Sequence, residues 1–145
     1  MATPMRTGRD LRITRLWQAG VLAAVIAAVL NVILYLLARA LGTSFAVELP
    51  GQGATEVQIV GVIVLTVVPL LVATLVYGLL RRLTRQAFRV FLILAIVVFL
   101  ILLVPPFTAA RDLSTAVALI LMHVVAAAAI ISTLALFERS TLPSA

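Results

Sequence analysis

Four long apolar stretches, separated by short polar segments, dominate the hydrophobic pattern of the chain. They cover approximately residues 16–41, 59–80, 88–104 and 113–137. An α-helix rises ~1.5 Å per residue, so runs of about 17–25 residues span a hydrocarbon core ~30 Å thick. The first run exceeds the ~7–15 apolar residues of a cleavable signal, so we interpret it as a retained span. The pattern predicts one integral membrane domain over residues 1–145, an all-α transmembrane four-helix bundle.

The first stretch carries a stripe of small and polar residues at helical spacing. Small side chains allow a neighbouring helix to approach closely, and polar side chains at membrane depth need protein partners. The stripe therefore predicts a buried seam. Its members are Gly20, Ala24, Ala27 or Ala28, Asn31, Tyr35 and Arg39, followed by Gly42.

The composition agrees with a membrane protein. Hydrophobic residues make up 64% of the chain and charged residues only 11%, far from the averages of soluble domains. A bilayer must then replace water around most of the exterior. The sequence contains no cysteine, which excludes disulfides and thiolate metal sites.

The arginines predict the orientation of the bundle. Of the 11 basic residues, nine lie in the N-terminal head, in residues 81–89 and in the C-terminal tail, and the other two are Arg39 and Arg111. Basic segments are retained in the cytoplasm, so both termini are expected there. The net charge of +6 is thereby explained by the membrane, without a nucleic acid partner.

The cytoplasmic arginines are also candidates for contact with anionic lipid head groups. The alternative is that they only set the topology. The candidate residues are Arg12, Arg15, Arg81, Arg82, Arg85 and Arg89.

A second group of candidates lies within the spans. Counting from the span centres places Asn31 and His123 at similar depth, with Thr66 near the middle of the second span. We expect a hydrogen-bonded cluster of Asn31, His123 and Thr66, with Tyr35 and Arg39 further outward. Its role is either to fix helix packing or to form an outer-side ligand pocket. Arg39 is expected either at the interface, reaching phosphate, Glu48, Glu56 or Asp112, or at the mouth of that pocket.

The sequence offers little for catalysis. A metal site needs several converging donors, and one histidine without a carboxylate in the spans is too few. No phosphate-binding loop, zinc motif or serine nucleophile motif is present. The sequence predicts no catalytic residue, metal or cofactor and favours a protein that is not an enzyme, with an enzyme or pigment-binding protein built on His123 as the weakest alternative.

The order of these features resembles an uncharacterised family of small four-span bacterial membrane proteins. The resemblance rests on Asn31 with Tyr35, on Gly42, on the prolines after the third span, and on Met122-His123 before an alanine run. It implies a multi-pass protein of the bacterial cytoplasmic membrane and no defined activity.

Together these features predict an accessory or structural membrane subunit. The alternative is a small carrier or ligand-binding protein using the pocket around Asn31 and His123. The apolar third span has broad lipid contact in either case. Self-association or another membrane protein is expected as a partner, besides membrane lipids that are anionic on the cytoplasmic side.

Overall fold

Four long apolar helical segments make up the structure, a computed structural model that describes residues 8–48, 51 and 53–141. The segments are long and apolar enough to cross a membrane, as the sequence predicted. The third is divided into two helices, and a small hairpin joins the first two segments. The elements are α1 (Gly8–Ala40), β1 (Ala46–Glu48), β2 (Ala54–Glu56), α2 (Ile59–Leu83), α3 (Ala87–Leu102), α4 (Val104–Ala109) and α5 (Leu113–Thr141).

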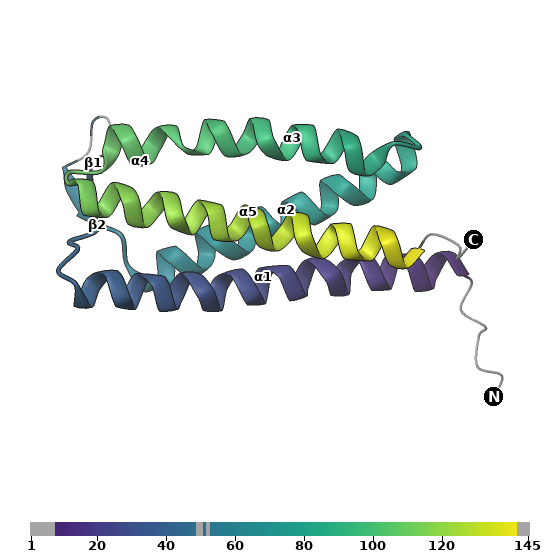
Figure 1. The fold of residues 1–145 in the computed structure, drawn as a ribbon, viewed down its shortest axis with the longest axis horizontal. Coiled ribbons are helices and arrows are strands. Elements are labelled where there is room, and N and C mark those ends of the chain that lie inside the picture. The colour runs from purple at the N-terminus through teal and green to yellow at the C-terminus, as the bar shows by residue number, and fades with distance from the viewer. Residues whose placement is uncertain (1–7, 49–50, 52, 142–145) are drawn as a thin grey trace.

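The helices lie side by side along one axis (Figure 1). Helix α1 packs against both α2 and α5, and α3 packs against α2 and α5 on the other side. The start of α1, the end of α5 and the α2–α3 connection lie at one end of the bundle, and the hairpin and the α4–α5 turn lie at the other (Figure 1). We call these the arginine end and the hairpin end.

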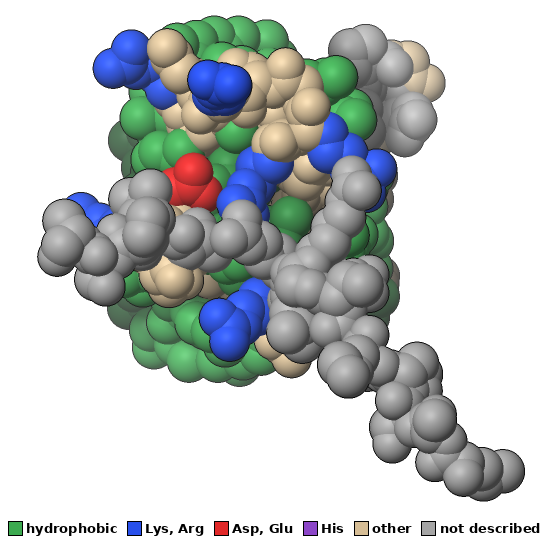
Figure 2. Space-filling model, turned by 90° about the vertical axis from the view of Figure 1, so that its right-hand side faces the viewer, with side chains coloured by type: hydrophobic (Ala, Val, Ile, Leu, Met, Phe, Trp, Pro, Cys, Tyr) green, Lys and Arg blue, Asp and Glu red, His purple; other side chains and the backbone are tan. Residues whose placement is uncertain are grey.

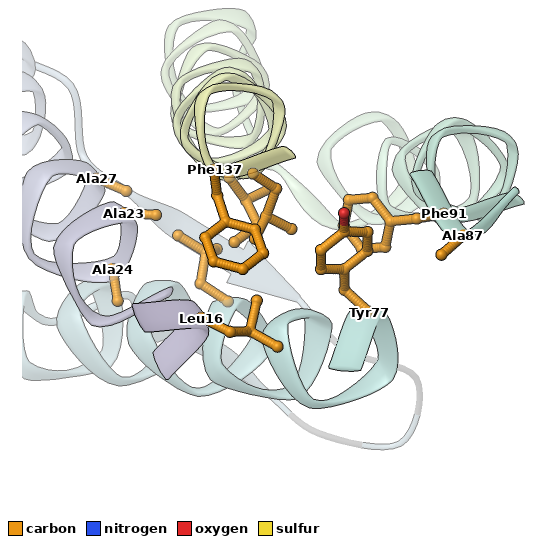
Figure 3. Packing of buried hydrophobic residues seen from close by; sticks show 11 residues of the cluster. Leu16, Ala23, Ala24, Ala27, Tyr77, Ala87, Phe91 and Phe137 are labelled. Carbon is orange, nitrogen blue, oxygen red and sulfur yellow. The ribbon is translucent and has the colours of Figure 1, made fainter. Parts of the chain in front are cut away.

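The seam predicted for α1 exists, and it is tightest at Gly20. A Cβ atom at this position would overlap the side chain of Thr74 in α2. Ala23, Ala24 and Ala27 follow as buried residues, and Leu134 of α5 belongs to the same core (Figure 3). Small residues thus let α1 approach two helices at once.

Helix α3 is the least covered of the four segments. Only 11% of its most apolar stretch is buried, against 22–28% in the other three. Its buried residues are Ala87 and Phe91, both near the arginine end. The expected broad apolar surface on the third span is therefore present.

The segment between the first two spans contains a short β-hairpin. Strands β1 and β2 pair in antiparallel register, with Ala46 opposite Glu56. Val47 also bridges to Ala110, which ties the hairpin to the α4–α5 turn. Phe45 adopts a positive φ of 54° and is fully buried. Its apolar ring is what turns the segment inward over the bundle.

The third span was predicted to run to residue 104, before the two prolines, and α3 ends close to that point, at Leu102. After Leu103 the chain forms α4, with the prolines in its first turn. A first turn leaves its N–H groups without helical partners, so proline loses nothing there. The prolines therefore start a new helix. Helices α1, α2 and α5 also extend beyond the predicted spans, because polar residues at their ends continue the helical hydrogen bonding.

Replacing Gly20 tests the seam. Gly20→Ala should lower the free energy of unfolding by about 1–3 kcal/mol, the usual cost of overpacking, because the new methyl group overlaps Thr74. Unfolding in mixed detergent measures the effect. Gly61→Ala is the matched control in α2, since a Cβ there meets only Val57 at 4.0 Å. Equal stability of the two variants would contradict a tight seam, and Thr74→Ala should restore the stability of Gly20→Ala.

Candidate functional site

Asn31 is the centre of the polar contacts at membrane depth. It lies in α1 and is 2% exposed. Its Nδ2 donates to Oγ1 of Thr66 in α2 at 3.0 Å and to the carbonyl oxygen of Met122 in α5 at 3.3 Å. The hydroxyl of Thr66 donates to the Val62 carbonyl at 2.7 Å, so its oxygen is free to accept from Asn31. One amide group thus links three helices.

The side-chain oxygen of Asn31 differs from its nitrogen. Among the described residues, Oδ1 of Asn31 is buried without a hydrogen-bond partner. A buried unpaired acceptor costs about 1–3 kcal/mol in a soluble protein, which offsets part of what the two donor bonds contribute. The amide therefore fixes which helix faces meet more than it raises total stability.

His123 lies beside this cluster and not in it. Its Nδ1 is 2.7 Å from the Leu119 carbonyl oxygen, one turn earlier in α5. The α5 group that reaches Asn31 belongs to Met122. Neighbouring helix residues point about 100° apart, so a depth estimate that is correct along the axis does not decide which residue faces α1. The hydrogen bond expected between Asn31 and His123 is replaced by the Met122 carbonyl.

Tyr35 and Arg39 hold the hairpin against the bundle. The Tyr35 hydroxyl donates to the Val57 carbonyl at 3.1 Å, and its ring lies 4.5 Å from the ring of Phe45. The Arg39 guanidinium donates to the Ser44 carbonyl and to Glu56, at 3.1 and 3.3 Å. Glu56 is one of the carboxylates that the sequence proposed for Arg39. Phe45 covers Tyr35 where the sequence alternative placed an open pocket.

Asp112 connects the hairpin segment to α5, a role that the sequence reasoning did not assign to it. It precedes α5 and accepts hydrogen bonds from the hydroxyls of Ser44 and Thr115 at 2.8 and 2.9 Å. The Ser114 hydroxyl and the Thr115 backbone N–H bind its other oxygen. These donors hold the pKa of Asp112 well below its usual range. The signal in the sequence was an aspartate directly before the apolar run that starts at Leu113, typical of a helix N-cap.

A polar contact at the arginine end was also missed, because Glu138 was taken as part of the tail. Helix α5 continues through it, and Oε2 of Glu138 accepts a hydrogen bond of 2.6 Å from the buried Tyr77 hydroxyl. Nε of Arg81 lies 3.9 Å from the same oxygen, and the guanidinium stacks 4.9 Å above the Phe137 ring. Figure 3 shows the Tyr77 ring beside Phe91 of α3. The centroids of the two rings are 5.3 Å apart.

Most of the arginines proposed for lipid contact are exposed at this end (Figure 2). Arg81 is the exception, since it is half-buried against Glu138 and Phe137. The side chain of Arg12 lies outside the described residues. The exposed ones are Arg15, Arg82, Arg85 and Arg89.

A groove of about 160 Å³ lies between α1 and α2 near the arginine end. Leu16 and Trp17 line it from α1, and Thr74, Gly78 and Arg82 line it from α2. Gly78 keeps it open, because a Cβ there would come within 3.1 Å of the Leu16 side chain.

Residues 11–140 match the profile of a family described as a family of unknown function, DUF6069. The chain belongs to the DUF6069 family. This confirms the resemblance noted from Asn31, Tyr35 and the Met122-His123 pair, since the match covers nearly the whole chain. No curated protein and no solved structure matches it significantly.

In this DUF6069 chain Asn31 should matter more for stability than His123. Asn31→Ala removes two contacts between helices, and such bonds contribute about 0.6–2 kcal/mol each in membranes. His123→Gln disturbs a contact within one helix and should have a smaller effect. Thermal unfolding in detergent gives the comparison, and a larger loss for His123→Gln would refute it. Thr66→Val should add little to Asn31→Ala, because the two residues share one hydrogen bond.

Proposed function

We propose that this protein is a non-enzymatic accessory or structural subunit of the bacterial cytoplasmic membrane. The observation that supports this is how the polar groups at membrane depth are used. Asn31 and Thr66 join helices of the same chain at this depth, and Tyr77 binds Glu138 at the arginine end. Meanwhile α3 presents a continuous apolar surface. These polar side chains bind within the bundle, and the exposed surface of α3 is apolar.

The alternative of a small carrier has less support. It needs an outer-side pocket, but Phe45 is buried against Tyr35 at the hairpin end. The groove described above lies toward the opposite end, between Trp17 and Arg82. Arg39, the proposed anion contact at the mouth of the pocket, pairs with Glu56.

The surface of α3 is the proposed contact for a partner subunit or a second copy. Ala23, Ala24 and Ala27 of α1, an alternative contact face, are already buried within the chain. Exposed side chains such as Ile93, Val97 and Leu100 remain on α3. Because membrane helices associate through close packing, the shape of this surface would decide which protein binds.

The arginine end is proposed to face the cytoplasm. Arg15, Arg82, Arg85 and Arg89 lie exposed there, whereas Arg39 and Arg111 at the hairpin end are each paired with a glutamate. Retention of basic segments in the cytoplasm supports this orientation. Their charge would also attract anionic head groups in that leaflet.

Photo-crosslinking tests the α3 contact. A photoreactive residue at Val97 in α3 should give discrete protein adducts in cells, because this face is left exposed by the described part of the chain. Ile26 in α1 is the control, as it is similarly exposed and also near the middle of its span. Adducts with lipid alone at Val97, or equal protein adducts at both sites, would argue against an accessory role through α3.

Single cysteines test the orientation. The chain has no cysteine, so Ala54→Cys in β2 and Gln86→Cys before α3 each carry one thiol. Both positions are exposed, at opposite ends of the bundle. A maleimide that cannot cross membranes should label Ala54→Cys in intact cells and Gln86→Cys only after lysis. The reverse labelling would overturn the orientation.

A further inference from the structure

The groove between α1 and α2 is oriented like a lipid acyl chain in a bilayer. Its α2 lining includes Thr74, Gly78 and Arg82, which are spaced by four and therefore lie in one row along the helix. At ~1.5 Å per residue this row extends ~12 Å from the apolar interior toward the arginine end. The groove thus runs parallel to the helices, as the acyl chains of a bilayer do.

The groove is apolar along its length and charged at one end. The Thr74 hydroxyl donates to the Leu70 carbonyl at 2.8 Å, so it presents no unpaired donor to the groove. Leu16, Trp17 and Leu75 supply apolar walls. Among the residues whose side chains the structure describes, Arg82 is the one charged member of the lining, and it stands at the end where other arginines gather.

The size of the groove limits what enters it. A volume of about 160 Å³ is close to the ~150 Å³ of an engineered protein cavity that binds benzene. It therefore holds a segment of one acyl chain and not a whole lipid. Trp17 is 40% exposed beside it, at the level where tryptophan favours the membrane interface.

From this geometry we propose that the groove binds one anionic phospholipid, with part of an acyl chain between Leu16 and Gly78 and the phosphate on Arg82. This deepens the proposed function and rests on its membrane-spanning arrangement. Arg82 suits the phosphate because a guanidinium offers forked N–H donors. Arg81, one position earlier, is directed instead to Glu138 and Phe137.

Trp17 is the single tryptophan of the chain and reports directly on the groove. The protein is reconstituted in phosphatidylcholine vesicles that contain a small fraction of lipid with brominated acyl chains, which quench tryptophan fluorescence on contact. Brominated phosphatidylglycerol should associate with Trp17 roughly fivefold better than brominated phosphatidylcholine, the factor expected from one arginine near the membrane surface.

Arg82→Gln should remove this preference, and Arg85→Gln should keep it, although both variants lose one positive charge at the same end. Gly78→Leu should reduce quenching by both lipids because it fills the groove. Gly61→Leu is its control in α2, where a Cβ would meet only Val57 at 4.0 Å. Thermal unfolding verifies that each variant is folded.

Two results would overturn the groove site: an unchanged preference in Arg82→Gln, or the same loss in Arg85→Gln. The second would mean that the arginine end attracts lipid only as a diffuse charge, which leaves the proposed function intact. Absence of quenching by either lipid would instead contradict the membrane-spanning arrangement itself.

Discussion

The close approach of α1 to α2 and α5 is the constraint on which the rest of the structure depends. In a bilayer, lipid is as apolar as the helix surfaces, so helices associate through tight packing and a few polar contacts and not through burial from water. Gly20 admits Thr74 where any side chain would collide, and Ala23 and Ala27 extend the contact. Once α1 is held at this distance, Asn31 is near enough to reach both neighbours.

Two polar connections then fix the helices at different levels, and they differ in kind. Asn31 joins α1 to α2 and α5 through neutral bonds in the apolar layer. Tyr77 and Arg81 join α2 to α5 through the Glu138 carboxylate at the arginine end, where water and head groups can stabilise charge. The carboxylate is thus placed where its desolvation costs least. The neutral amide takes the deeper position.

The sequence predicted the number and approximate position of the spans because both depend on hydrophobicity and length, which are local properties. It also placed Asn31 near Thr66 and Arg39 near Glu56, since depth follows from residue count. It did not predict that Met122, and not His123, supplies the α5 contact to Asn31. Neighbouring residues of a helix have nearly the same depth but point in different directions. Phe45 was missed for a related reason: its inward turn depends on a positive φ and on a ring contact with Tyr35, neither of which leaves a periodic pattern.

The position of α3 follows from these same contacts. It has no polar link of its own among the described residues, and its buried residues Ala87 and Phe91 lie near the arginine end. There Phe88 and Phe91 pack edge-to-face on Tyr77, whose hydroxyl is bound to Glu138. The hydrogen bond that joins α2 to α5 thus also orients the ring against which α3 rests. Further along, α3 has only apolar contacts, which lipid or a partner helix supplies equally well. The helix is therefore anchored at one end, and along the rest of its length it offers the apolar surface that the proposed contact with another membrane protein would need.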